Sequence, residues 1–350
     1  MVGNKGTIMP GGRKIYPQHS RRWRAAAAAS LALGLLALLP ASARAQDKRP
    51  EHPELTIAVS VTDSTFLPIY VAEDAGLFKA EGLNPKLLSF HGGSDLTRAV
   101  VAGSVQIGLA SPTSVLSAIS AGQNVKVFFG GFNQAPFSWY AVRSIKTMAQ
   151  AKGKRFGISR FGSATDALTR FAMTQAGLDP AKDAKIIQTG GSASALAAME
   201  TGQIDVGVFS IPSNFTAADR GYSLIARQSD FMADFPVQSF YADVKYLDDN
   251  PATVRAVLRA FIKAVTLTKT DKPLAVKILA ARTGLKPDYA ARAYDQLIGG
   301  WREDGRLATE QGMANFFKMA IASGDVDGPW PKEKYWDNRF MATIDQWKPK

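Results

Sequence analysis

The feature that most constrains the fold is a short segment that occurs twice. Residues 102–111 read AGSVQIGLAS, and residues 201–210 read TGQIDVGVFS. Glycine, glycine and serine recur at the same three places, and between them each copy places apolar residues alternately, as a buried strand does. Each copy follows a helix-like segment that ends at glycine and precedes another helix-like segment. The chain therefore predicts two similar αβ units.

Strand-like and helix-like segments alternate around both copies. The apolar runs predict strands over 55–60, 84–90, 105–110, 124–132, 154–159, 184–190 and 204–210. Helix starts are indicated by Ser64 or Thr65, by Ser111 before Pro112, and by Ser163 with Asp166 at capping-box spacing. This alternation favours mainly parallel sheets covered by helices. From residue 250 onward the pattern becomes helical, with apolar residues at one helix face: Val254, Val257, Leu258, Phe261 and Val265.

Residues 1–45 have a different character. A basic segment ends in SRRWR, and the apolar stretch 25–39 is shorter than the ~20 residues that span a bilayer. Ala43 and Ala45 then form an A-x-A cleavage pattern. We predict a cleaved export signal, cut near Ala45, and a periplasmic protein that begins with a flexible lead-in over 46–53. The pair Arg21-Arg22 leaves open whether the export route is the general secretory one or the twin-arginine one.

Charge and composition exclude several classes of function. The net charge is +12, but seven of the basic residues lie in 1–45, which contain no acid, so the remaining chain carries only +5. No basic run follows that could track phosphates, which argues against nucleic-acid binding. The chain has no cysteine, and only His52 and His91 lie beyond residue 45. No catalytic triad, zinc-protease motif, Walker loop or dinucleotide fingerprint occurs, so we expect binding without turnover, and neither a metal nor a cofactor.

The order of motifs resembles a known family. LPIYVAEDAGLFKAEGLNPKL, followed by GGSDLTRAVVAGSVQIGLASPTSVLSAISAGQNVKVF, is similar to the substrate-binding proteins of ABC importers for nitrate, sulfonates and thiamine precursors. AKGKRFGISRFGSATDALTRFAMTQAGL resembles the start of that family's second lobe, and NPATVRAVLRAFIKAV and YWDNRFM resemble its C-terminal helices. The resemblance covers about residues 54–345.

The resemblance implies a type II periplasmic-binding-protein fold, an α/β fold in which two lobes close on a ligand by a hinge movement. Lobe one would comprise 54–141 plus 240–350, with the C-terminal helices packed on it, and lobe two would comprise 142–239. The two crossovers would lie near 139–143 and 235–243. The partners implied are a small-molecule ligand and an ABC permease with its ATPase, and the receptor itself would be a monomer.

The candidate ligand-binding residues lie in loops that precede helices, where free N–H groups and small hydroxyl side chains suit an oxyanion. The candidates are Ser64, Thr65, Phe66, Ser94, Ser111, Thr113, Arg160, Gly162, Ser163, Thr165, Ser210 and Asn214. Each hydroxyl residue can equally be a plain helix cap, and Arg160 can equally be a surface residue. Whether His91 or Asp63 contacts the ligand stays open, although an anionic ligand would disfavour Asp63.

These patterns predict a receptor for a small anionic organic molecule of the sulfonate or carboxylate class. Two alternatives remain. One is a receptor for thiamine pyrimidine or another heterocycle. The other is an enzyme on the same fold, similar to a pyrimidine synthase or a menaquinone-pathway lyase, although the former uses a cysteine-rich motif that this chain lacks. A sensory role in place of transport is also compatible with the sequence.

Overall fold

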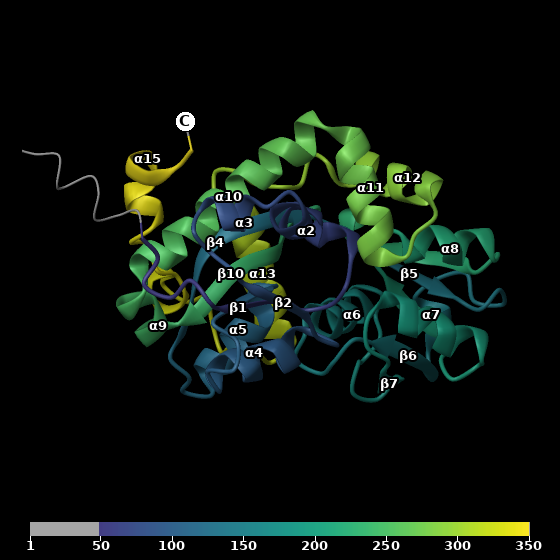
Figure 1. The fold of residues 1–350 in the computed structure, drawn as a ribbon. Coiled ribbons are helices and arrows are strands. Elements are labelled where there is room, and N and C mark those ends of the chain that lie inside the picture. Colours follow the sequence, from purple (N-terminus) through teal and green to yellow (C-terminus); the bar gives the residue numbers. More distant parts are fainter. Residues whose placement is uncertain (1–48, 350) are drawn as a thin grey trace, which may run out of the picture. The chain divides into compact units, whose positions relative to one another are not determined.

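The computed structural model describes residues 49–349, and the predicted export signal lies outside them. The first of two sheets has the strand order β2-β1-β3-β10-β4 (Figure 1). β1 is parallel to β2 and β3, whereas β10 is antiparallel to β3 and β4. The strands are β1 (Thr56–Val59), β2 (Lys86–Ser89), β3 (Ile107–Ala110), β4 (Val125–Gln134) and β10 (Asp234–Asp243).

The second sheet repeats this plan, with the order β7-β6-β8-β5-β9. β6 is parallel to β7 and β8, and β5 is antiparallel to β8 and β9. The strands are β5 (Ser138–Ala141), β6 (Lys154–Ile158), β7 (Ala184–Gln188), β8 (Val206–Phe209) and β9 (Ser223–Arg227). The two copies of the repeated segment form β3 and β8, which occupy the same place in the two sheets. The prediction of two similar αβ units and of a type II periplasmic-binding-protein fold is confirmed.

Helices connect the strands and cover the sheets. In lobe one, which we define by the first sheet, they are η3 (Ser64–Phe66), α2 (Leu67–Asp74), α3 (Leu77–Ala80), α4 (Gly93–Val101) and α5 (Pro112–Ser120). Lobe two, defined by the second sheet, has η4 (Ala149–Ala151), α6 (Ala164–Gln175), α7 (Ser192–Glu200), α8 (Ser213–Asp219) and η5 (Gln228–Asp230). The C-terminal part adds α9 (Val244–Asp249), α10 (Pro251–Thr270), α11 (Lys272–Thr283), α12 (Pro287–Leu297), α13 (Glu310–Ala322), α14 (Lys332–Tyr335), η6 (Met341–Thr343) and α15 (Ile344–Trp347).

The chain passes between the sheets at 135–137 and at 228–233, a few residues before the predicted crossovers. β5, which the prediction assigned to lobe one, pairs in the second sheet, and β10, of which 234–239 were assigned to lobe two, pairs in the first. The reason is that each crossing strand adds itself, antiparallel, beside the β3 or β8 strand of the sheet that it enters. Sheet membership therefore begins earlier along the chain than the predicted lobe limits.

Of the C-terminal helices, α10 packs on lobe one, as the sequence predicted, whereas α12 and α13 also contact α8 and α6 of lobe two. The apolar face of α10 is buried against α2 and α3. Phe261 of α10 packs edge-to-face on Phe240 of β10, with 4.7 Å between the centroids of the two rings. The first described residues, before β1, are hydrogen-bonded to the same helix. Glu51 accepts hydrogen bonds from the backbone N–H groups of Ala252 and Thr253, at 2.9 and 2.7 Å. The described part of the predicted lead-in is therefore anchored at the start of α10.

Candidate functional site

A pocket lies where the carboxyl ends of the parallel strands in both sheets meet. The cavity that it encloses measures about 60 Å³. Both lobes and the first crossover contribute to the wall, which consists of Ser60, Val61, Asp63, Thr65, Phe66, Gly92, Gly93, Ser111, Ser114, Pro136, Phe137, Ile158, Ser159, Ser163, Ala164, Thr165, Gly190, Gly191, Ser192, Ala195, Val208, Ser210 and Val237. This wall is an apolar surface with many hydroxyl groups, a form that suits a small organic ligand.

Asp63 supplies the charged group of this wall. It follows β1 and starts the short helix η3, where its Oδ1 accepts hydrogen bonds from the backbone N–H and the hydroxyl of Thr65, both at 2.9 Å. Its other oxygen accepts a hydrogen bond from the hydroxyl of Ser210 in lobe two. The residue is only 7 % exposed. Burial raises the pKa of the Asp63 carboxyl, and the hydrogen bonds from Ser210 and Thr65 oppose that rise.

A cluster of three hydroxyls faces the pocket from lobe two. Ser159 at the end of β6 lies 2.8 Å from the hydroxyl of Ser163 and 2.7 Å from that of Thr165. The Ser163 hydroxyl also donates to the carbonyl of Arg160 at 2.6 Å. The capping box predicted for Ser163 and Asp166 is wrong in detail, because Asp166 reaches back to the N–H of Gly162 instead. The cluster sits at the first turn of α6, so it combines hydroxyl groups with free N–H groups of a helix start.

A second set of hydroxyls in lobe two connects to lobe one. The hydroxyl of Ser192 accepts a hydrogen bond from the backbone N–H of Ser210 at 3.0 Å, and the two hydroxyls lie 2.9 Å apart. Ser210 then donates to Asp63. These three residues form a continuous chain of hydrogen bonds from one lobe to the other across the pocket wall.

Six of the twelve predicted residues line the pocket: Thr65, Phe66, Ser111, Ser163, Thr165 and Ser210. Three others lie nearby without lining it. The hydroxyl of Thr113 bonds to that of Ser111 at 3.0 Å, while Ser64 Oγ and Asn214 Oδ1 are buried without a hydrogen-bond partner in the protein. Ser64 lines a neighbouring depression together with Asp63 and Ser192. The exposed His91 lies outside the pocket wall.

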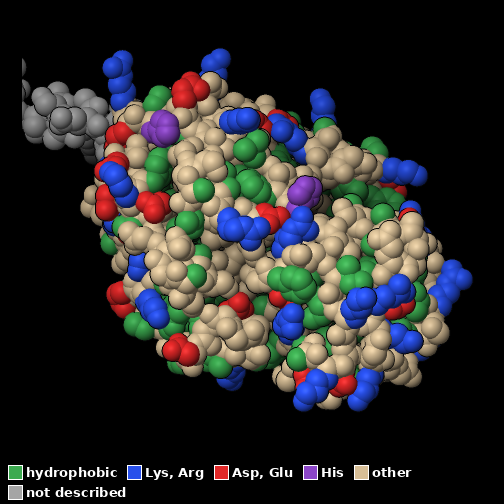
Figure 2. Space-filling view, turned by 90° about the horizontal axis from the view of Figure 1, so that it is seen from below, with side chains coloured by type: hydrophobic (Ala, Val, Ile, Leu, Met, Phe, Trp, Pro, Cys, Tyr) green, Lys and Arg blue, Asp and Glu red, His purple; other side chains and the backbone are tan. Residues whose placement is uncertain are grey.

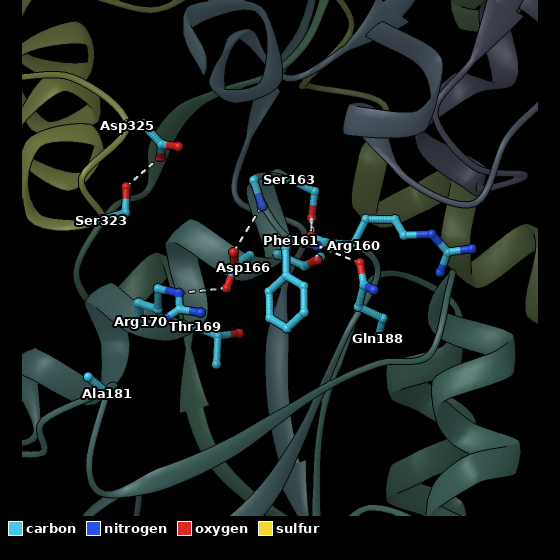
Figure 3. A network of polar contacts seen from close by, with 12 residues as sticks. Arg160, Phe161, Ser163, Asp166, Thr169, Arg170, Ala181, Gln188, Ser323 and Asp325 are labelled. Carbon is cyan, nitrogen blue, oxygen red and sulfur yellow. Dashed lines mark hydrogen bonds and ion pairs between the residues drawn. The ribbon is translucent and has the colours of Figure 1, made fainter. Parts of the chain in front are cut away.

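The last three, Ser94, Arg160 and Gly162, lie at a contact between the lobes beside the pocket. Arg160 donates from Nε to Asp95 of lobe one at 2.8 Å, and Ser94 donates from its hydroxyl to the carbonyl of Phe161 at 2.8 Å. Figure 3 shows the Arg160 side chain pointing away from those of Ser163 and Asp166. The Arg160 guanidinium donates to Asp95 and to the carbonyl of Ser159, so a role of Arg160 in ligand binding stays a prediction.

Several wall residues were missing from the predicted set. The repeat could have identified Ser192. Ser210 follows Ser111 by 99 residues, and the same offset makes Ser192 the equivalent of Gly93, which begins α4 after β2. Ser159 directly follows the first parallel strand of lobe two, β6, as Ser60 directly follows β1 in lobe one. Phe137 of the crossover also lines the pocket, whereas Trp139 of β5 and Phe209 of β8 are fully buried in the core.

The fold and this pocket define a two-lobed solute-binding protein. The chain belongs to the family described as NMT1/THI5 like, whose profile matches residues 63–272. A protein of Brucella abortus (strain 2308) named "Putative binding protein" is 26 % identical over 288 residues, which cover 78 % of this chain and 86 % of that one. A solved structure from Bordetella bronchiseptica RB50 shares 25 % identity at a TM-score of 0.73, with 85 % and 98 % of the two chains covered.

Two further structures share the fold at lower identity. The periplasmic aliphatic sulphonate binding protein SsuA from Escherichia coli has a TM-score of 0.63 at 21 % identity, with 82 % and 92 % of the two chains covered. The desulfurization enzyme DszB has a TM-score of 0.61 at 11 % identity, with 84 % and 99 % covered. Relatives and neighbours of this chain are mostly binding proteins, but the fold also carries an enzyme.

Residues 49–349 offer no second type of site. No helix there is long and apolar enough to cross a membrane, and no group of three or more His, Asp and Glu side chains is placed to hold a metal ion. On the face of the molecule in Figure 2, Lys and Arg side chains are dispersed among Asp and Glu and form no single basic patch. The pocket between the lobes therefore stands as the candidate functional site.

Proposed function

We propose that this protein is a periplasmic receptor that captures a small organic solute between its two lobes and delivers it to an ABC importer. The observation that carries the proposal is the pocket wall. Both lobes contribute polar groups to it, and the Ser210–Asp63 hydrogen bond connects the two lobes within it. A solute that contacts both sides would favour the closed arrangement over an open one, and a permease can distinguish the two. Among the relatives, SsuA is named as a sulphonate-binding protein of the periplasm.

The ligand class follows from the chemistry of the wall. The hydroxyl groups of Ser111, Ser163 and Thr165 lie at the starts of α5 and α6, and they suit the oxyanion of a sulfonate or carboxylate, the class predicted from the sequence. However, the wall contains no Lys, Arg or His, and it does contain the Asp63 carboxylate. That carboxylate would repel a purely anionic solute, and it favours the alternative of a heterocycle or another solute with hydrogen-bond donors.

A thermal-shift screen of the purified protein tests the receptor function. The screen covers nitrate, alkyl sulfonates, aromatic carboxylates, pyrimidines and flavins. A solute at a hundred times its dissociation constant stabilises the folded protein by about 2.7 kcal/mol, which raises the melting temperature measurably. Mass spectrometry of the recovered solute separates binding from turnover: a receptor returns it unchanged.

Uptake in cells tests the delivery step and the location. Deleting the gene is expected to abolish import of the labelled solute, and fractionation is expected to recover a mature chain beginning near Gln46 from the periplasm. Normal uptake in the deletion strain would overturn the transport role, and a chain that retains residues 1–45 in the cytoplasm would overturn the location.

A further inference from the structure

Asp63 differs from the other buried carboxylate that the structure describes. Asp63 and Asp166 are the two acidic residues in 49–349 whose exposure is below 9 %. Asp166 has a cation beside it, because Arg170 donates to it from Nε at 2.7 Å. Asp63 has no Lys, Arg or His among its hydrogen-bond or ion-pair partners in the described chain, and its three donors are all uncharged groups of Thr65 and Ser210. A buried carboxylate that lacks a cation is unfavourable unless something else supplies the compensating charge or donors.

The carboxylate also has capacity left for another donor. Two carboxylate oxygens offer about four acceptor positions. Thr65 uses two of them on Oδ1, and Ser210 uses one on Oδ2. The remaining position belongs to Oδ2, the oxygen that accepts the hydrogen bond from Ser210 of lobe two.

Asp63 is accessible to a ligand in spite of its burial. It lines the pocket, and it also lines the neighbouring depression, together with Ser192. Asp63 therefore belongs to the walls of both hollows. A solute in the pocket meets Asp63 as the sole ionisable side chain among the residues that line it.

We propose that Asp63 determines ligand specificity, by accepting a hydrogen bond from an N–H or N⁺–H group of a nitrogen-bearing solute held between the lobes. This inference rests on the proposed receptor function and adds to it the chemical class of the ligand. A cationic or amide-like nitrogen supplies the donor and charge that the wall lacks, whereas a solute that offers only oxyanion atoms places like charge against a desolvated carboxylate.

Matched pairs of probes test the inference by calorimetry on the wild-type protein. The pairs are benzamidine against benzoate, 2-aminoethanesulfonate against 2-hydroxyethanesulfonate, and 4-aminopyrimidine against pyrimidine. A hydrogen bond to a charged group changes affinity by about 10- to 100-fold, so the N–H-bearing member of each pair that binds is expected to be tighter by that factor. This comparison needs no variant.

Asp63→Asn then removes the charge while an amide oxygen can still accept the Thr65 hydrogen bonds. The preference within each pair is expected to fall to about threefold or less. Asp243→Asn is the matched control, because Asp243 also accepts from the N–H two residues ahead, at 2.9 Å, but at the start of α9 and outside the pocket. That variant is expected to keep the full preference.

The outcomes separate the two proposals. If solutes bind but those without N–H groups bind as well as or better than their partners, the role of Asp63 is overturned and the receptor function stands. An unchanged preference in a folded Asp63→Asn protein overturns it too. If no probe and no solute of the wider screen binds, the receptor function fails, and this inference fails with it.

Discussion

Ser111 and Ser210 occupy equivalent places in the two lobes, yet they serve different purposes. Ser111 acts locally: its hydroxyl accepts from the N–H of Thr113 at 3.4 Å and caps α5. Ser210 acts across the pocket: its hydroxyl donates to Asp63 of the other lobe. The repeated segment therefore places a hydroxyl on each side of the pocket, and the residues after it decide which partners that hydroxyl has.

The cause lies in the position of one proline. In lobe one, Pro112 follows the serine directly and is the first residue of α5, which makes Ser111 the N-cap. In lobe two, Ile211 intervenes, Pro212 is the N-cap residue and α8 begins only at Ser213. Ser210 therefore lies before the helix cap, and its hydroxyl is available for Ser192 and Asp63.

The largest expected effect on the free energy of unfolding concerns the strand glycine that both copies of the repeated segment share. Gly108 and Gly207 lie in the middle of β3 and β8, and a Cβ would come within 2.5 Å of the Tyr241 ring at the first and 2.4 Å of the Phe209 ring at the second. Gly108→Ala and Gly207→Ala are each expected to lower the free energy of unfolding by about 1–3 kcal/mol through overpacking. Gly108→Ala should cost more, because Tyr241 is held by a 3.0 Å hydrogen bond to Thr97.

Urea unfolding measures both losses. Gly328→Ala is the control, because no atom lies within 4 Å of the position of its Cβ, and its stability should match that of the wild type. A variant at either strand with wild-type stability would contradict the close packing that makes the two copies alike.

The fold was predictable from the sequence to the extent that local signals define it. The repeat, the apolar runs and the Ser111-Pro112 helix start predicted seven strands and their pairing into two units. β5, β9 and β10 were not predicted as strands. β10 pairs with β3, more than a hundred residues earlier in the chain, so no local pattern identifies its partner.

The site was predictable only in part, for a related reason. Hydroxyl residues that follow strands, such as Ser163 and Ser210, were found because their position along the chain places them at the sheet edge. The use of Arg160 could not be found in this way, because its partner Asp95 belongs to the other lobe. The chemistry of the pocket likewise depends on Asp63, whose lack of a cation becomes visible only when its surroundings are assembled.

The second prediction tests the different use of the two serines. Ser210→Ala removes a donor from a buried carboxylate and is expected to cost about 1–3 kcal/mol in the free energy of unfolding. Ser111→Ala removes a long cap bond and is expected to cost about 1 kcal/mol or less. Urea unfolding of Ser210→Ala and Ser111→Ala measures these two losses. Unfolding of Asp63→Asn and of the Asp63→Asn/Ser210→Ala double variant then tests the contact, because the losses of the single variants Asp63→Asn and Ser210→Ala should not add in the double variant. Additive losses would show that Ser210 and Asp63 are not coupled.

The third prediction compares the buried acids of the two lobes as pH changes. Burial raises the folded-state pKa of Asp63 above its ordinary value of 3.8. The folded protein then binds a proton more tightly than the unfolded chain does, so the stability contributed by this group rises as pH falls through the raised pKa and levels off below 3.8. The neighbouring Tyr70 and Arg282 do not change charge between pH 7 and pH 4. The Tyr70 hydroxyl accepts a hydrogen bond from the Asp63 N–H, and burial raises the pKa of Tyr70 above its ordinary value. The Arg282 guanidinium lies over the Tyr70 ring.

The measurement is the wild-type free energy of unfolding minus that of Asp63→Asn, taken between pH 7 and pH 4. This difference is expected to increase in favour of the wild type as pH falls. Asp166→Asn provides the comparison in lobe two, where burial also raises the pKa of Asp166 but Arg170 and the N–H of Gly162 oppose the rise. A wild-type curve parallel to that of Asp63→Asn would contradict the assignment.

The smallest expected effect concerns the contact at which Arg160 of lobe two reaches Asp95 of lobe one. Their side chains are 28 % and 20 % exposed, so the ion pair is worth about 0–1 kcal/mol and weakens as salt is added. Arg160→Gln is expected to raise the population of open molecules slightly, seen as a larger radius of gyration without solute. Arg98→Gln is the matched control, because Arg98 pairs with the same Asp95 from within lobe one and joins no second lobe. An equal expansion in both variants would show that the pair stabilises Asp95 and not the closed arrangement.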